Sequence, residues 1–192
     1  MDTWGRCFYT RNSLMAGLPD LALSVRQPWA WAIIYGGKII ENRSLGSIKA
    51  GNMDCRTICI HAASAMKRDE YDWAVWRLER HGVACPRPDI LTYGGIIGTV
   101  DVVDIITESD SEWFGGQAGL VLENPKAIEP IPAKGTLGYF RWERGGALVP
   151  PALWMKTWDR PNGDSDTLDL FNAAPQFAKG PEKPFQTSKK NS

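Results

Sequence analysis

The chain has no excess of either charge, because its 22 Lys and Arg residues balance its 22 Asp and Glu residues. A non-specific nucleic-acid coat normally carries a large positive excess, so that class is excluded, whereas a local basic groove is compatible with a balanced chain. Long apolar runs are also missing. The longest, residues 28–34 and 94–100, are far shorter than the roughly 20 residues that span a bilayer, so we expect no transmembrane helix and no membrane partner. Residues 1–20 lack the basic region and apolar core of a secretory signal.

Residues that build disulfide frameworks and metal centres are few. The 192 residues include four cysteines and two histidines, and a chain of this size needs no disulfide stapling, which favours a reducing, cytoplasmic location. The spacings Cys55-x3-Cys59-x-His61 and His81-x3-Cys85 differ from the CxxC pairs of a structural zinc ribbon, so we assign no metal ligands. P-loop, GxGxxG, GxSxG and HExxH motifs are absent.

Three zones differ in composition. Residues 1–20 mix Gly, Asn, Arg and Ser without a sustained period, which predicts a flexible N-terminal arm. Residues 21–158 alternate apolar runs with turn signals and are expected to form one folded domain. Residues 159–192 are rich in Pro, Lys and Ser, which predicts a C-terminal extension that is disordered or loosely docked.

Hydrophobic periodicity within residues 21–158 predicts mostly strands. One helix is expected to begin at Pro28 and end at the Gly36-Gly37 pair, and a second to cover residues 67–81. The segments with extended character are 21–25, 38–44, 57–62, 94–106, 119–123 and 138–142. They are too closely spaced for repeated βαβ units. The expected fold class is therefore α+β and β-rich, a small barrel of about six short strands with helices at its ends.

The most informative segment contains Lys38, Glu41 and Arg43, which follow the first expected helix. In a regular strand starting at residue 38, Glu41 and Arg43 would share one face and Lys38 would lie on the other. If the strand begins only after Lys38, all three side chains can converge. A lysine and a carboxylate in one partly buried site shift each other's pKa toward the charged form, whereas desolvation lowers the pKa of the lysine. The simpler alternative is a surface ion pair at a helix exit.

The pattern Gly36-x-Lys38-x-x-Glu41-x-Arg43, preceded by Leu-Ser-x-Arg-Gln-Pro-Trp, resembles the signature of the ASCH family, whose domains are relatives of the PUA RNA-binding fold. The resemblance covers roughly residues 21–143 and continues through three more blocks, Ile58-Cys-Ile-His61-Ala, Gly95-Ile-Ile-Gly98-Thr-Val and Leu120-Val-Leu-Glu123-Asn-Pro. It implies a PUA-like β-barrel of five or six strands with flanking helices. In such a barrel the motif lines a cleft that is a site for RNA or a nucleotide.

The residue types around the motif suit that role. Arg26, Lys38 and Arg43 can contact phosphate, with arginine supplying a bidentate fork. Trp29 or Trp31 can stack on an unpaired base, which is how single-stranded RNA is commonly held. Tryptophans at helical spacing are also typical core residues, and this alternative stays open for both.

Glu41 completes the expected site, because its carboxylate can accept a hydrogen bond from an exocyclic amine or hold Arg43 in place. The function that we expect is binding of RNA, single-stranded or structured, or of a modified base or nucleotide. No cofactor is expected, and the expected oligomeric state is a monomer.

Two other functions stay open. Some ASCH members are amidohydrolases that remove acetyl from acetylated cytidine with a lysine and a threonine three residues later; this chain has Lys38 but has Glu41 in place of that threonine. If the chain is an enzyme, the expected catalytic residues are Lys38 and Glu41, with Tyr93 and His61 as weaker candidates. Resemblance to bacterial ribonuclease members would also admit a divalent metal. The last alternative is a protein-interaction module without a nucleic-acid ligand.

Overall fold

A computed structural model describes residues 17–159 of the chain. Most of the expected N-terminal arm (1–20) and all but the first residue of the expected C-terminal extension (159–192) lie outside this range, so both stay predictions. Within residues 17–159 no helix is long and apolar enough to cross a membrane.

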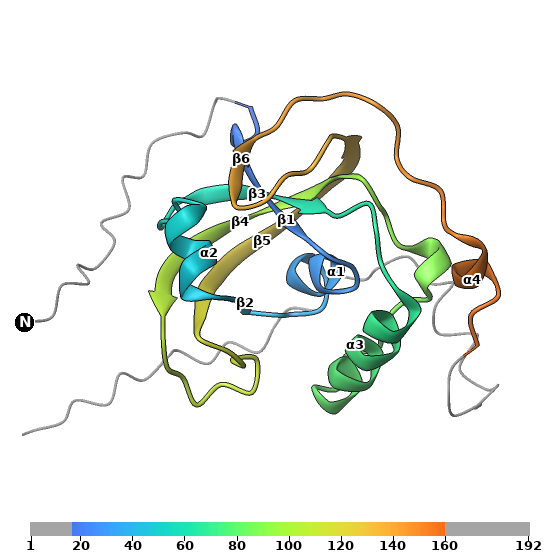
Figure 1. Cartoon of the computed structure of the whole chain (residues 1–192), viewed down its shortest axis with the longest axis horizontal. Helices are drawn as coiled ribbons and strands as arrows, with labels where there is room; N and C mark the ends of the chain where they lie inside the picture. The colour runs from blue at the N-terminus through green and yellow to red at the C-terminus, as the bar shows by residue number, and fades with distance from the viewer. Residues whose placement is uncertain (1–16, 160–192) are drawn as a thin grey trace, which may run out of the picture. The chain divides into compact units, whose positions relative to one another are not determined.

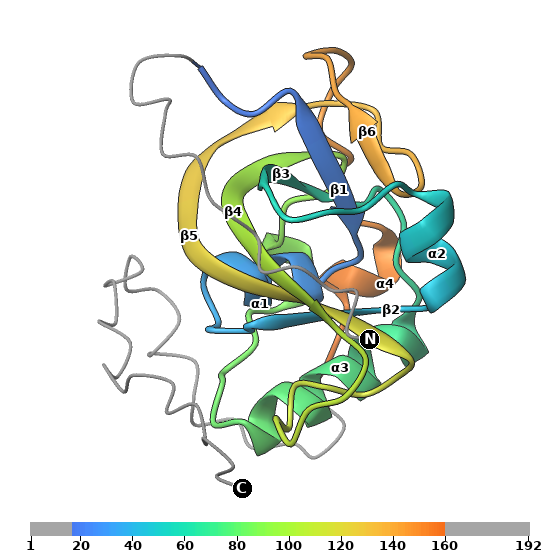
Figure 2. The same cartoon turned by 90° about the vertical axis from the view of Figure 1, so that its left-hand side faces the viewer.

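In the described residues, six strands form one mixed sheet that is strongly curled into a half-barrel (Figures 1 and 2). The strands follow the order β2-β5-β4-β3-β1-β6, in which β1 and β3 are parallel and the other neighbours are antiparallel. Their bounds are β1 Leu21–Val25, β2 Ile40–Arg43, β3 Thr57–Ala62, β4 Gly95–Ile106, β5 Ala118–Pro132 and β6 Tyr139–Arg141. The expected β-rich α+β class, a small barrel-like sheet with flanking helices, is confirmed.

Helix α1 (Trp29–Ile34) packs against the concave side of the curled sheet (Figure 1). Its Ile33 and Ile34 join the main core, which also contains Leu23, Ile60 and Val100 from the sheet. The helix lies so close to β4 that a Cβ on Gly98 would be 2.6 Å from the Ile34 side chain. A glycine at this point of β4 therefore allows the close approach of helix and sheet.

The two outer strands, β2 and β6, are joined across the open side of the half-barrel by α2 (Leu45–Ala50). Ser44 caps α2, because its hydroxyl oxygen accepts a hydrogen bond from the Ser47 N–H. At the other end, the Gly51 carbonyl accepts a hydrogen bond from the Tyr139 N–H of β6 at 3.3 Å. We call the gap between β2 on one side and β1 and β6 on the other the seam.

Helix α3 (Arg68–Arg80) stands beside the half-barrel on a second core of its own (Figure 1). Its buried residues are Tyr71, Ala74, Val75 and Leu78. Tyr71 meets Trp158 edge to face, with ring centroids 5.1 Å apart. The indole N–H of Trp158 donates to the Asp72 carboxylate at 2.7 Å. These contacts join α3 to the segment around residue 158.

Both expected helices and all six expected extended segments are present, with two differences. Strand β5 runs to Pro132 instead of ending near residue 123, because it pairs with β4 along both halves of its length. Two short helices, α2 and α4 (Leu153–Lys156), and a 3-10 turn, Pro88–Ile90, were not expected from the sequence.

Candidate functional site

Lys38, Glu41 and Arg43 converge into one ion-paired cluster, which we call the motif cluster. The Lys38 Nζ donates to Glu41 Oε2 at 2.7 Å and to the Ile40 carbonyl. Arg43 Nη2 lies 3.2 Å from Glu41 Oε1, so the carboxylate is shared between two cations. Lys38 and Glu41 are only 5% and 8% exposed. The cluster is therefore a buried feature and not the surface ion pair of the simpler interpretation.

The turn after α1 causes the convergence. Gly37 adopts φ 69°, and the Lys38 N–H donates to the Ala32 carbonyl at 3.0 Å, which turns the chain back beneath the helix. Strand β2 begins only at Ile40. Strand alternation therefore does not govern Lys38, and its side chain lies on the same side as Glu41.

Charge and burial act against each other at Lys38. Burial lowers the pKa of its ammonium below the usual value, Glu41 opposes that shift, and the nearby Arg43 and Arg77 add to it. Two cations around one carboxylate leave the motif cluster with a net charge of about +1 when all three groups are ionised. The cluster is thus electropositive in a chain that is neutral overall.

Arg43 also ties the motif cluster to the far side of the seam. Its Nη2 donates to the Ser24 carbonyl of β1 at 2.9 Å, although β2 and β1 are not neighbours in the sheet. The Arg43 Nε is buried and has no hydrogen-bond partner among residues 17–159.

An open cleft of about 620 Å³ lies over the seam, beside the motif cluster. Its lining comes from several elements and includes Ser24, Arg26, Trp29, Glu41, Arg43 and His61. Arg26 stands at the rim, where its side chain is 62% exposed and paired with Glu70 of α3. The cleft therefore brings together most of the residues that the sequence predicted for the site.

His61 lines this cleft, and both of its ring nitrogens are hydrogen-bonded. Its Nε2 lies 3.0 Å from the Ala133 carbonyl, and its Nδ1 lies 3.0 Å from Ser24 Oγ. Because a carbonyl can only accept, Nε2 carries the proton and Nδ1 accepts from the Ser24 hydroxyl. Burial lowers the pKa of His61, which agrees with a neutral ring. The ring packs so closely on the 133–138 segment that a Cβ on Gly135 would lie 2.6 Å from Nδ1.

A second hollow of about 270 Å³ adjoins the cleft, and Trp29, Glu41 and Asn42 line both. We call it the tryptophan cavity, because Trp29, Trp73 and Trp113 all line it. Trp29 and Trp73 meet edge to face, with ring centroids 5.7 Å apart. Lys38 and Arg77 supply its cations.

The wall formed by Trp113 is held from two sides. The Trp113 ring stacks on His81, with centroids 3.7 Å apart and planes 6° from parallel. The Asn42 side chain donates to the Trp113 carbonyl and accepts from the Gly115 N–H, both at 2.8 Å. Asn42 therefore fastens the loop after β4 to strand β2. Its place between Glu41 and Arg43 was the one sequence signal that could have pointed to it, whereas Trp73 and Trp113 lie far from the motif.

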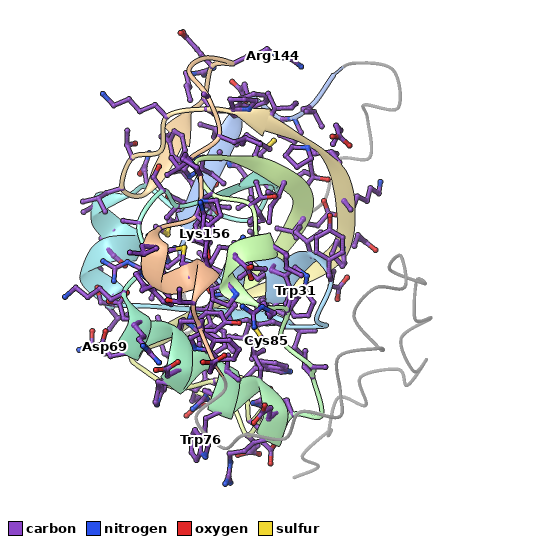
Figure 3. The ribbon with its side chains drawn as sticks, turned by 90° about the vertical axis from the view of Figure 1, so that its right-hand side faces the viewer. Trp31, Asp69, Trp76, Cys85, Arg144 and Lys156 are labelled. Carbon is purple, nitrogen blue, oxygen red and sulfur yellow. The ribbon has the colours of Figure 1, made fainter. Side chains whose placement is uncertain are left out.

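Two of the predicted site residues lie elsewhere. Trp31 lines a separate hollow of about 200 Å³, where it stacks on Tyr35 with centroids 6.3 Å apart (Figure 3). Tyr93 is buried, and its hydroxyl donates to the Pro88 carbonyl at 2.8 Å. Burial raises the pKa of that hydroxyl. Neither residue lines the cleft or the tryptophan cavity, because α1 directs Trp31 and Trp29 to different sides.

The cysteines form no visible metal site. Within the described part of the chain, no group of three or more His, Cys, Asp or Glu residues could hold a metal ion. Cys59 and Cys85 are buried, and burial raises the pKa of Cys59 to about 12. Cys55 is disulfide-bonded, although a chain of this size was not expected to need a disulfide. The cytoplasmic location stays a prediction.

Comparison with known proteins adds no assignment. No family model matches the chain, and no curated protein matches it.

Proposed function

We propose that the chain is an ASCH-type, PUA-like domain that binds RNA, or a modified base or nucleotide, in the cleft over the seam. One observation carries the proposal: a neutral chain concentrates cations at this place. The cleft and the tryptophan cavity together are lined by four cations and one carboxylate, namely Arg26, Lys38, Arg43, Arg77 and Glu41. Such a local excess attracts a polyanion without the overall positive charge of a non-specific coat.

The cations differ in what they can offer a phosphate. Arg26 is largely exposed, and its ion pair with Glu70 is a surface pair of the kind that contributes about 0–1 kcal/mol. Exchange of Glu70 for a phosphate oxygen therefore costs little. Lys38 and Arg43 are already held by Glu41, so they contribute a fixed positive potential at the floor rather than mobile contacts.

Trp29 supplies the aromatic surface. Its partly buried ring lines both hollows, and Lys38 Nζ lies 5.8 Å from the ring centroid. A base that stacks on one aromatic side chain gains roughly 1–3 kcal/mol regardless of its identity. A site that holds a phosphate at its rim and a base on Trp29 fits an unpaired nucleotide better than a duplex, because the bases of a duplex are already stacked on one another.

A hydrolase is the second candidate, and the buried Lys38 favours it. A desolvated lysine whose pKa is lowered can act as a base or nucleophile. His61 and Tyr93 do not add a proton relay, because both make internal hydrogen bonds to carbonyl groups. Binding without catalysis therefore needs fewer groups than hydrolysis needs.

The test uses fluorescein-labelled single-stranded and hairpin RNA of mixed sequence, with and without Mg²⁺ or Mn²⁺, on paired native and denaturing gels. We expect a salt-sensitive shift with intact RNA. Arg26→Gln should weaken it and lower the slope of log K against log[salt] by about 0.7, the value for one phosphate contact on a single strand.

The matched control is Arg141→Gln. Arg141 is an exposed arginine on β6 that is also paired with an aspartate, Asp20, and it lines neither hollow. Equal weakening by both variants would contradict a specific role for the cleft. If the wild type shortens the RNA and Lys38→Ala does not, the function is that of a nuclease and not of a binding domain. If neither a gel shift nor RNA cleavage is observed, the ligand is a free modified nucleoside or a protein partner.

A further inference from the structure

Helix α3 carries a second side-chain stripe on the face opposite its core. The buried residues 71, 74, 75 and 78 follow the spacing i, i+3, i+4, i+7 that marks one face of a helix. Residues 73, 76, 77 and 80 repeat this spacing two positions later, which is a rotation of about 200°. They are Trp73, Trp76, Arg77 and Arg80, and we call them the Trp–Arg stripe.

Core packing does not account for this stripe. Trp73 and Trp76 are 54% and 53% exposed, although tryptophan is highly buried on average. Figure 3 shows Trp76 on the outer side of α3. Each indole has an arginine one turn later that lies over its ring: Arg77 Cζ is 5.8 Å from the Trp73 centroid, and Arg80 Cζ is 5.0 Å from that of Trp76. The stripe is thus two cation–π pairs side by side on one helix face.

We propose that the Trp–Arg stripe is a second contact surface for a single strand of RNA, which continues the strand out of the cleft. The proposal rests on the function proposed above. Exposed indoles offer stacking surfaces for bases, and arginines offer charge for phosphates together with a plane on which a base can also stack. The two arginines disfavour a cationic partner.

The stripe is continuous with the cleft. Trp73 and Arg77 line the tryptophan cavity, which adjoins the cleft at Trp29, and Trp73 touches that ring directly. Trp76 and Arg80 lie further along α3. From residue 73 to residue 80 the axis advances about 10 Å, at 1.5 Å per residue. That length matches about three nucleotides stacked 3.4 Å apart.

The sign of the charge gives the direction of the strand. One turn before Trp73 the same face carries Asp69, an exposed carboxylate that repels phosphate (Figure 3). After Trp73 the face carries Arg77 and Arg80. The strand therefore leaves the tryptophan cavity toward the C-terminal end of α3. RNA that fills only the cleft does not reach Trp76, whereas a longer strand does.

The experiment compares mixed-sequence RNAs of 4 and 12 nucleotides by fluorescence anisotropy, with the full chain. Trp76→Leu should weaken binding of the 12-mer about tenfold, from the loss of one stacked base, and leave the 4-mer unchanged. Trp76→Phe keeps a stacking ring and should stay within about twofold of the wild type. Arg80→Gln should lower the salt slope for the 12-mer by about 0.7 and Arg141→Gln should not.

The outcomes separate this proposal from the function on which it rests. If Arg26→Gln weakens both RNAs and Trp76→Leu weakens neither, the cleft binds RNA and the stripe does not. If Trp76→Leu weakens the 4-mer as much as the 12-mer, the residue acts on the cleft, which also overturns the proposal. If the wild type binds neither RNA, this proposal falls together with RNA binding by the cleft. If Trp76→Leu binds RNA normally but turns a wild-type dimer into a monomer in sedimentation, the stripe holds a second copy of the chain instead.

Discussion

Removing Glu41 from the motif cluster should destabilise the fold more than removing Lys38. The carboxylate lies between two cations, 2.7 Å from Lys38 Nζ and 3.2 Å from Arg43 Nη2. Glu41→Gln leaves both cations in a largely buried site without a counter-charge. Lys38→Met removes one cation and leaves Glu41 still paired with Arg43. The order of the two effects follows from the position of the carboxylate and not from the size of the side chains.

The magnitudes follow from burial. Breaking a buried pair so that a charge loses its partner costs about 3–5 kcal/mol, so Glu41→Gln should fall in this range. Lys38→Met leaves the Ile40 carbonyl without its ammonium donor, which costs about 1–3 kcal/mol. The difference between the variants is then about 2 kcal/mol, which exceeds the usual error of extrapolation from denaturant.

The assay is urea unfolding followed by tryptophan fluorescence, at pH 7 and in low salt. The two single variants and the double variant form a double-mutant cycle, in which we expect a coupling free energy between Lys38 and Glu41 of about 1 kcal/mol or more. A Lys38→Met variant that is as unstable as Glu41→Gln would refute the reasoning, because Glu41 would then not be held by Arg43.

Three further predictions concern the walls of the cleft and of the tryptophan cavity. Gly135→Ala should lose about 1–3 kcal/mol in urea unfolding, because its Cβ would lie 2.6 Å from His61 Nδ1; Gly145→Ala, which meets nothing within 4 Å, is the control and should lose little. Burial lowers the pKa of both histidines, so below pH 6.5 the unfolded chain takes up protons that the folded chain does not. Stability should therefore fall from pH 6.5 to 5.5 with a slope of up to about 1.4 kcal/mol per pH unit for each histidine, and His61→Asn should reduce that slope; an unchanged slope would show that His61 titrates normally. Asn42→Ala should cost about 1–3 kcal/mol for its two hydrogen bonds and speed proteolysis of the loop after β4; no change in cleavage would mean that the loop is held by ring stacking alone.

The helices and strands with a strong hydrophobic periodicity could be predicted from the sequence. β1 and β3 have the residue bounds that alternation indicated, and α3 differs from its expected range by one residue at each end. The short helix α2 carries no comparable signal, because six residues hold too few turns for a periodic pattern. Its existence depends on the Ser44 cap and on the contact of Gly51 with Tyr139, which belongs to a strand far along the chain.

The candidate site also has a part that could be predicted from the sequence and a part that could not. Convergence of Lys38, Glu41 and Arg43 could be predicted, conditional on where β2 begins, because all three are local in sequence. The tryptophan cavity could not be predicted, since Trp73 comes from α3 and Trp113 from the loop after β4. A sequence shows that tryptophans are numerous, but only tertiary packing shows which of them meet.

The position of the motif cluster has a consequence for every binding experiment on this chain. Arg43 pairs with Glu41 and also donates a hydrogen bond across the seam to the Ser24 carbonyl. The stability of the fold depends on these contacts, and so would the binding of a ligand. Substitutions there change stability and binding together, so a loss of affinity alone does not identify a contact with RNA. Arg26 and Trp76 are exposed and lie outside the main core, and their loss leaves the seam intact. Variants of these two residues therefore separate recognition from folding, which variants of the motif cluster cannot do.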